Sequence, residues 1–250
     1  MAWISYAQAL EDIHLLRALA GVHHDEGFYI DVGAWDPEFD SVTKLFYDAG
    51  WRGINIEPSP HRYERLAARR QRDVNICAAV SETPGEIALY HDVGASPLST
   101  TVKAIAERHE ANHYMRSEIL MVKAMTLTQI CADHAPAKIH FLKIDVEGAE
   151  ETVLRSLDLS RYRPWFLCIE CHYPMRTDLQ TYDAWEPYLC YHHYRFVFTD
   201  KWRINRYYVT EEHAERANAA FAVPADFYIP ASLDRRVRDL EAELEALRHK

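Results

Sequence analysis

Short apolar runs alternate along the chain with longer stretches in which apolar residues recur every three or four positions. The apolar runs have the length of buried strands and occupy residues 28–32, 53–57, 74–80, 87–93, 140–148 and 165–172. The stretches with helical spacing occupy residues 3–20, 41–50, 61–72, 126–135 and 148–157. Strands that alternate with helices predict an α/β fold, in which helices cover both faces of an open, mostly parallel sheet.

Two later regions depart from this alternation. Residues 94–120 are polar and irregular, and we expect them to cross the surface with one helical stretch near 102–110. Residues 194–200 and 206–212 both have strand character, which predicts a late antiparallel pair.

The C-terminal residues 231–250 follow a third pattern. Apolar residues step by four and three at Leu233, Val237, Leu240, Leu244 and Leu247. This heptad spacing predicts a coiled-coil-like helix through which the chain forms a homo-oligomer. The repeat is short for a coiled coil, so a single amphipathic helix folded back on the domain is the alternative. We therefore divide the chain into a domain of residues 1–230 and a helical tail of residues 231–250. Within the domain, an N-terminal helix in residues 1–25 is expected to cover the ligand site.

The charge of the chain limits its partners. The net charge is −10, from 28 basic and 38 acidic residues. An acidic surface repels a phosphate backbone, so nucleic acid is not an expected partner. The basic run at 65–72 is expected to form the solvated face of a helix.

Hydropathy and cysteine content indicate the compartment. No window approaches ~18 uninterrupted apolar residues, so no membrane span is expected. The first residues lack the basic flank of a signal peptide. The cysteines are expected to be buried free thiols at positions 77, 131, 168, 171 and 190. Together these features predict a cytoplasmic protein.

Acidic residues follow several of the apolar runs directly, at Asp31, Glu57, Asp145 and Glu170. In a parallel sheet the carboxyl ends of the strands share one edge, where ligands bind, so we expect these acids in one cleft. Gly33 would let a ligand approach the first strand-to-helix turn closely. Glu57 suits the two hydroxyls of a ribose.

The turn DVGAWDPEF, residues 31–39, lacks the GxGxxG pattern. This argues against an oxidoreductase that binds the pyrophosphate of a nicotinamide or flavin cofactor. A nucleoside that carries an amino acid and no pyrophosphate fits the turn better.

Four stretches, DVGAWDP, INIEPSP, LKIDVEGAEETVL and CIE-H, resemble the FkbM-type methyltransferases. The resemblance runs from about residue 3 to about residue 230 and is strongest at LKIDVEGAE. It implies a Rossmann-like class I fold and O-methylation of sugars or other secondary-metabolite hydroxyls with S-adenosylmethionine. The methyltransferase domain would then be residues 1–230.

Three further motifs are similar to a subgroup found near polysaccharide glycosyltransferases. They are SYAQ-x-x-ED at 5–12, PLST at 97–100 and INRYYVTEEH at 204–213. Pro97 replaces a glycine of that subgroup, and TDKWR at 199–203 replaces its FDG. The subgroup implies a sugar hydroxyl of a bacterial surface polysaccharide or related glycan as the acceptor.

The resemblance also implies which residues contact each ligand. Asp31 and Gly33 would lie at the methionine end of the cofactor, and Glu57 would hold the ribose. The full set of implied cofactor-binding residues is Asp31, Gly33, Ala34, Glu57, Pro58, Ala78 and Ala79. We also expect acceptor contacts from Ser99, Thr100, Asn205 and Arg206, with a surface ion pair as the alternative for Arg206.

Methyl transfer requires an aligned acceptor oxygen and removal of its proton. We expect Asp145 at the sulfonium end and His172 as the general base, on the same strand face as Glu170. A structural histidine paired with a carboxylate is the alternative. Lys143 is a rival base if it is desolvated, unless it forms an ion pair with Asp145 or Glu147. The candidate catalytic residues are Asp145, His172, Glu170 and Lys143.

Other interpretations remain open. Asp145, Glu170 and His172 could hold Mg²⁺ or Mn²⁺, which would lower the pKa of the hydroxyl. Glu150 and Glu151 are expected only to favour the dipole of the helix that they begin. The chain could also be a non-catalytic scaffold or oligomerisation module of a polysaccharide assembly complex, or methylate a small secondary metabolite.

Overall fold

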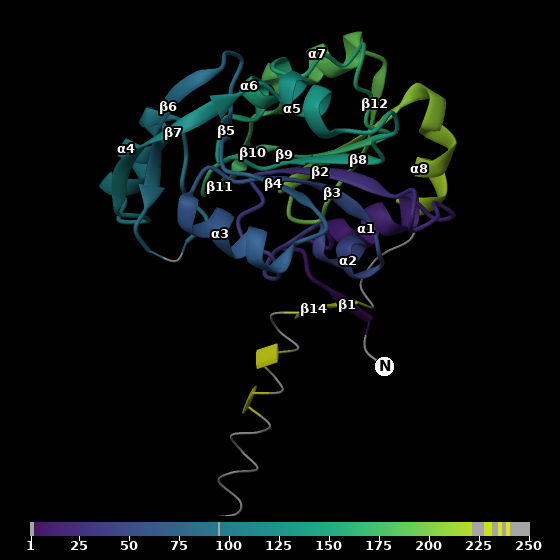
Figure 1. The fold of residues 1–250 in the computed structure, drawn as a ribbon, viewed down its shortest axis with the longest axis horizontal. Coiled ribbons are helices and arrows are strands. Elements are labelled where there is room, and N and C mark those ends of the chain that lie inside the picture. Colours follow the sequence, from purple (N-terminus) through teal and green to yellow (C-terminus); the bar gives the residue numbers. More distant parts are fainter. Residues whose placement is uncertain (1–2, 95, 222–227, 232–234, 237–238, 241–250) are drawn as a thin grey trace, which may run out of the picture.

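The computed structural model describes residues 3–94, 96–221, 228–231, 235–236 and 239–240. At its centre lies a seven-stranded sheet with the strand order β12-β13-β9-β8-β2-β3-β4 (Figure 1). The strands are β2 Phe28–Val32, β3 Arg52–Ile56, β4 Val74–Ile76, β8 Phe141–Ile144, β9 Phe166–Glu170, β12 Tyr194–Thr199 and β13 Asn205–Thr210. Neighbours from β4 to β9 pair in parallel, whereas β13 is antiparallel to β9 and β12. The predicted α/β fold with a mostly parallel sheet and a late antiparallel pair is confirmed.

Helices cover both faces of this sheet (Figure 1). One face carries α5 Leu127–His134, α6 Glu150–Arg155 and α7 Glu186–Tyr191. The other face carries α1 Glu11–Ala18, α2 Lys44–Asp48, α3 Pro60–Arg69 and α8 Ala214–Ala220. Successive strand residues reach opposite layers, so Ile30 packs with Leu127 while its neighbour Tyr29 packs with Phe46. Burial on both faces explains why the strands are continuous apolar runs.

A three-stranded sheet with the order β5-β7-β6 lies beside the main sheet (Figure 1). Its strands are β5 Ala79–Val80, β6 Gly85–Asp92 and β7 Ser117–Met125, and α4 Lys103–Ala111 precedes β7. The helical stretch near 102–110 is thus confirmed, but the single strand predicted at 74–80 is divided between two sheets. The prediction that 117–120 is irregular was wrong. All eight residues of β6 pair with β7. Within β7, the side chains of Ile119 and Met121 are 63% and 62% exposed.

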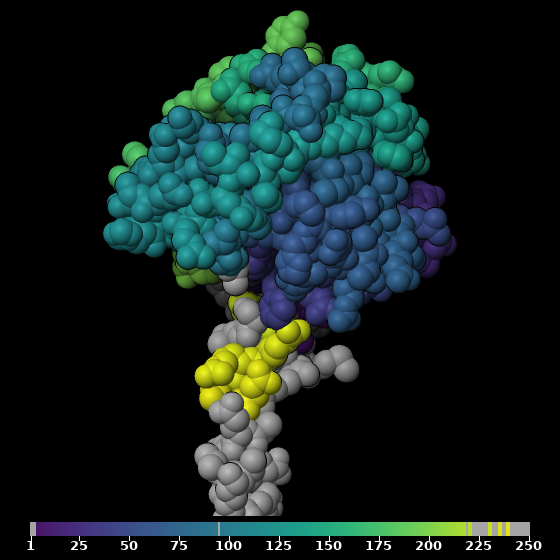
Figure 2. All heavy atoms as spheres, turned by 60° about the vertical axis from the view of Figure 1, so that its left-hand side comes forward, coloured from purple at the N-terminus to yellow at the C-terminus, as the bar shows by residue number. Residues whose placement is uncertain are grey.

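The small sheet and α3 lie side by side on the surface in Figure 2. The Arg62 guanidinium of α3 donates to the carbonyl oxygen of Ser96, after β6, at 2.6 Å. This bond joins α3 to the loop after β6 beside the carboxyl edge of the main sheet.

The N-terminal helix is shorter than the predicted 3–20. Trp3–Ser5 forms β1, which pairs in parallel with β14 Tyr228–Pro230, and α1 begins at Glu11. The Asp12 carboxylate accepts from the Ser5 hydroxyl at 2.6 Å and from the Tyr6 N–H at 2.7 Å. Because these bonds hold residues 5 and 6 against the first turn, the preceding segment cannot continue the helix.

The sequence predictions for the tail and the cysteines have mixed outcomes. Of the heptad positions only Leu240 is among the described residues, so the coiled-coil helix and the oligomer remain predictions.

All five cysteines are free; Cys131, Cys168 and Cys171 are buried, but Cys190 is exposed and Cys77 is partly exposed. In the part of the chain that the structure describes, every helix is too short or too polar to cross a membrane.

One member of the basic run at 65–72 is not solvated. The Arg70 guanidinium is buried and donates to the carbonyl oxygen of Pro37 and to the Ser41 hydroxyl. It therefore fastens the end of α3 to the loop after β2.

Candidate functional site

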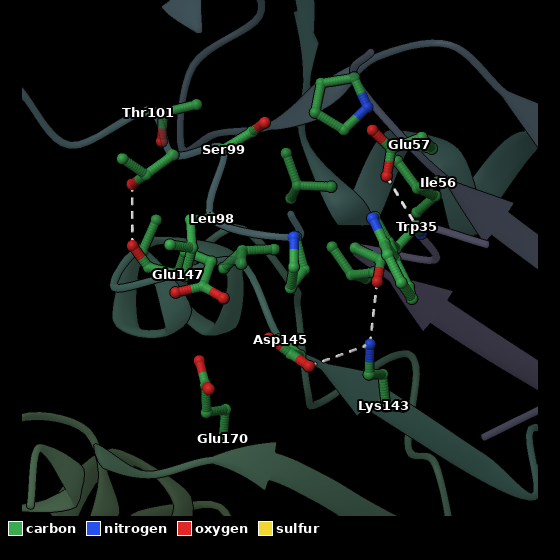
Figure 3. Close-up of a pocket in the computed structure, with 18 of the residues that line it drawn as sticks. Trp35, Ile56, Glu57, Leu98, Ser99, Thr101, Lys143, Asp145, Glu147 and Glu170 are labelled. Carbon is green, nitrogen blue, oxygen red and sulfur yellow. Dashed lines mark hydrogen bonds and ion pairs between the residues drawn. The ribbon is translucent and has the colours of Figure 1, made fainter. Parts of the chain in front are cut away.

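A cavity of about 400 Å³ lies at the carboxyl ends of β2, β3, β8 and β9 (Figure 3). Most of the predicted site residues line it, namely Gly33, Glu57, Pro58, Ala78, Ala79, Ser99, Thr100, Lys143, Asp145, Glu170 and His172. Four others, Asp31, Ala34, Asn205 and Arg206, are not among its lining residues. The shared edge of a parallel sheet therefore brings together acids that are distant in sequence.

Glu57 follows β3 and is held by two backbone donors. Its carboxylate accepts from the Trp35 N–H at 3.1 Å and from the Ser59 N–H at 2.9 Å. Burial raises the pKa of Glu57 to about 6, although these bonds and the Arg62 guanidinium act in the opposite direction. The fixed carboxylate retains accepting capacity toward the cavity.

Gly33 is required at the turn after β2. Its φ is +79°, and a Cβ there would lie 1.8 Å from the carbonyl oxygen of Asp145. The turn and the loop after β8 can approach this closely only because position 33 has no side chain. The N–H groups of Gly33 and Ala34 both donate to the carbonyl oxygen of Ile56, so the Ala34 N–H serves the fold.

Lys143 lies between two carboxylates. Its Nζ is 3.4 Å from Asp31 Oδ1 and 3.5 Å from Asp145 Oδ2, and it donates to the carbonyl oxygen of Gly33 at 2.9 Å. Burial alone would lower the pKa of Lys143, but Asp145 and Asp31 raise it well above its ordinary value. A general base would need a lowered pKa, so the geometry favours the ion-pair alternative. Asp31 is buried and is not a lining residue, but it pairs with Lys143, which does line the cavity.

Asp145, Glu147 and Glu170 form an acidic cluster on the side of the cavity away from Glu57 (Figure 3). One oxygen from each lies within 4.8 Å of the others. Glu170 is 6% exposed, and its Oε2 has no hydrogen-bond partner among the described residues. Burial, followed by the neighbouring carboxylates, raises the pKa of Glu147 and Glu170 well above the ordinary range. The cluster therefore favours a bound proton or cation.

The loop after β8 differs from the sequence prediction. β8 ends at Ile144, so strand alternation does not place Glu147, which instead has a φ of 54°. The Glu150 carboxylate accepts from the N–H groups of Val146 and Gly148 at 3.2 and 3.0 Å. Glu150 is buried, which raises its pKa to about 7, so its role is to hold this loop and not only to favour the helix dipole.

His172 lies on the short strand β10 His172–Tyr173, which pairs with β11 Arg176–Gln180. Its Nδ1 is 2.9 Å from the carbonyl oxygen of Tyr173, and its Nε2 is 3.3 Å from Glu170 Oε1. A carbonyl oxygen can only accept, so Nδ1 carries hydrogen, and Nε2 is the nitrogen that faces the Glu170 carboxyl group. His172 is thus paired with a carboxyl group at the wall of the cavity.

The predicted acceptor contacts separate into two groups. Ser99 and Thr100 line the cavity, and the Thr100 hydroxyl donates to the carbonyl oxygen of Glu147 at 2.8 Å. Asn205 is buried and donates to Glu11 at 2.8 Å. Arg206 lies outside the cavity wall, because its guanidinium stacks on Tyr182 and Phe196 and pairs with Glu186.

Several lining residues were absent from the sequence-predicted set. They are Gln8, Glu11, Trp35, Arg62, Glu147, Met175 and Thr177. The motif SYAQ-x-x-ED contains Gln8 and Glu11, but the apolar pattern assigns both residues to one continuous helix and not to the site. Met175 and Thr177 come from the β10–β11 hairpin, which the apolar pattern does not mark.

Comparison with known proteins identifies the family. Residues 31–196, more than half of the chain, match the family model for the methyltransferase FkbM domain. The chain is also similar to a crystal structure of methyltransferase FkbM from Methylobacillus flagellatus KT, with 16% sequence identity and a TM-score of 0.47. That similarity covers 74% of this chain and 44% of the other, so this chain spans less than half of its length. No curated protein matches the chain.

Proposed function

The chain belongs to the methyltransferase FkbM domain family, and on this basis we propose that it is an S-adenosylmethionine-dependent O-methyltransferase. The proposed acceptor is a sugar hydroxyl of a surface polysaccharide or related glycan. The observation that carries the cofactor assignment is Glu57, a carboxylate fixed by two backbone N–H groups at the wall of the cavity.

The residues present fit this cofactor. The turn at Gly33 lines the cavity and lets the loop after β8 lie close to β2, and Glu57 offers acceptors to the two ribose hydroxyls. Apolar side chains suited to a base line the cavity at Ile56, Ala78, Val80, Leu89 and Leu98. When bound, S-adenosylmethionine supplies an electrophilic methyl group on a sulfonium.

The reacting side of the cavity must orient the acceptor and take its proton. His172 Nε2 and Glu170 Oε1 are 3.3 Å apart, so one proton taken by Nε2 would be held between the imidazolium and the ionised carboxylate. We assign the pair as the base, with His172 receiving the hydroxyl proton and Glu170 stabilising the imidazolium. Lys143 keeps the Asp145 carboxylate in place, and Ser99 and Thr100 are proposed acceptor contacts.

A divalent cation is the alternative way to activate the hydroxyl. The carboxylates that would hold Mg²⁺ or Mn²⁺ are Asp145, Glu147 and Glu170, so Glu147 replaces His172 in the ligand set considered from the sequence. The unpartnered Oε2 of Glu170 favours this alternative. Bound cation would lower the pKa of the hydroxyl without a histidine base.

Calorimetric titration with S-adenosylmethionine tests the cofactor. Glu57→Ala should weaken binding by roughly 1–3 kcal/mol, the loss expected for charge-assisted hydrogen bonds. An unchanged dissociation constant in the folded variant would remove Glu57 from the site. No binding by the wild type at millimolar cofactor would leave the scaffold alternative.

The acceptor is tested by mass spectrometry of products. Methylated glycan fragments support the proposal, whereas transfer only to small hydroxylated metabolites favours the other acceptor class.

A further inference from the structure

The motif SYAQ-x-x-ED at 5–12 precedes the matched family region 31–196, and the proposed chemistry leaves it unused. In the structure, hydrogen bonds hold this segment in one position. Asp12 binds the Ser5 hydroxyl and the Tyr6 N–H, and the carbonyl oxygen of Tyr6 accepts from the Ser41 N–H at 3.0 Å. These bonds hold the segment beside the loop that follows β2.

Two polar side chains of this segment, Gln8 and Glu11, line the cavity. Asp40, next to Ser41, lines it as well, and so does Gly33. The segment therefore contributes to the wall of the same cavity as the glycine turn.

Glu11 is buried and held in one orientation. It is 4% exposed, and its carboxylate accepts from the Ala9 N–H at 2.6 Å and from the Asn205 amide at 2.8 Å. Asn205 is itself fixed, because its N–H donates to Asp200 at 2.6 Å. Asn205 is thus a positioning residue for Glu11, which explains why it is not among the lining residues itself.

The burial of Glu11 has an electrostatic consequence. Burial raises the pKa of Glu11 to about 8, and the nearby acids Asp12 and Asp200 add to this effect. A cation bound beside the carboxylate would offset the cost of its charge. Lys143 is already engaged by Asp31 and Asp145.

These groups match the amino acid end of the proposed cofactor. An α-ammonium requires acceptors, which Glu11 and Asp40 supply, and an α-carboxylate requires a donor, which the Gln8 amide supplies. We propose that Gln8 and Glu11 form the subsite for this zwitterion, with Glu11 on the ammonium and Gln8 on the carboxylate. The inference rests on the proposed function.

Two ligands separate this subsite from the nucleoside site. S-adenosylhomocysteine carries the ammonium and the carboxylate, whereas 5′-methylthioadenosine has the same nucleoside without the amino acid. In calorimetry, Glu11→Gln should weaken S-adenosylhomocysteine about tenfold or more and leave 5′-methylthioadenosine within about twofold. Gln8→Ala, at an exposed side chain, should show the same selectivity. Glu26→Gln, an exposed acid outside the cavity wall, is the matched control and should change neither.

The outcomes distinguish the two proposals. If the wild type binds neither ligand, the proposed function fails, and the subsite with it. If the wild type binds both but neither variant shows selectivity, the subsite is overturned and the proposed function stands. An equal loss of both ligands in Glu11→Gln with no selectivity in Gln8→Ala would mean that the segment only supports the fold.

Discussion

The acids on the two sides of the cavity differ in how their oxygens are satisfied. On the β2–β3 side, Glu57 accepts from two backbone N–H groups. Asp31, whose Oδ1 has no hydrogen-bond partner among the described residues, accepts from the Thr43 hydroxyl at Oδ2 and forms an ion pair with Lys143. On the β8–β9 side, Glu147 and Glu170 lie against each other, and Glu170 Oε2 has no hydrogen-bond partner among the described residues.

The two arrangements suit different tasks. A carboxylate with fixed donors keeps one geometry, which suits recognition of a ligand. Carboxylates that repel one another gain most from a proton or a cation, which suits a site where charge changes during reaction. The side proposed for the cofactor is therefore organised before binding, whereas on the side proposed for the reaction the carboxylates repel one another.

The largest expected effect is on the rate of methyl transfer, and it tests whether the two sides of the cavity have separate tasks. His172→Ala should lower kcat by about 100-fold, because the proton acceptor is lost. Cofactor affinity should not change, since Glu57 and the glycine turn are untouched. Single-turnover methyl transfer and calorimetry on the same variant measure the two quantities.

The opposite result would favour the cation. If His172→Ala remains active while Glu170→Gln is inactive, and if Mn²⁺ restores activity after chelation, the base is not histidine. A parallel loss of cofactor binding in His172→Ala would contradict the division between the two sides.

The sequence predicted the gathering of these acids, because the carboxyl ends of parallel strands share an edge wherever the strands lie in the chain. Glu57, Asp145 and Glu170 all reach the cavity for this reason. Asp31 was expected in the same cleft, but its buried side chain is not among the lining residues and pairs with Lys143. Asp31 lies within β2, one residue before its end at Val32, whereas Glu57 and Asp145 directly follow β3 and β8.

Features fixed by distant hydrogen bonds were not predictable from local pattern. Strand β7 escaped detection because Ile119 and Met121 are exposed and its pairing with β5 and β6 defines it. Gln8 was hidden within a predicted helix, although Asp12 turns the chain before that residue. Local periodicity carries no record of such contacts.

An intermediate effect is expected on the pH dependence of stability at Glu150, which holds the loop after β8. The pKa of Glu150 is about 7 in the fold, above its ordinary value near 4.5. A raised pKa means that its contribution to stability is complete below pH 4.5 and is lost as the pH rises past 7. Glu150→Gln lacks this loss, so from pH 5 to pH 8 the variant should gain about 1–3 kcal/mol on the wild type.

Urea unfolding at both pH values measures the difference for Glu150→Gln. A constant gap between variant and wild type would show that Glu150 is ionised throughout and that its bonds to Val146 and Gly148 outweigh its burial.

The smallest effect is expected one residue away and tests whether position alone decides the role of an acid. Glu151 begins the same helix as Glu150, but it is half-exposed and pairs with Arg155 at 2.8 Å on the surface. Water screens such a pair, and its net contribution is small. Glu151→Gln should therefore leave unfolding free energy, its pH dependence and methyl transfer unchanged within measurement. If Glu151→Gln instead reproduced the pH-dependent gain of Glu150→Gln, the acids of this helix would form one electrostatic unit. The buried loop could then no longer be treated apart from the helix surface.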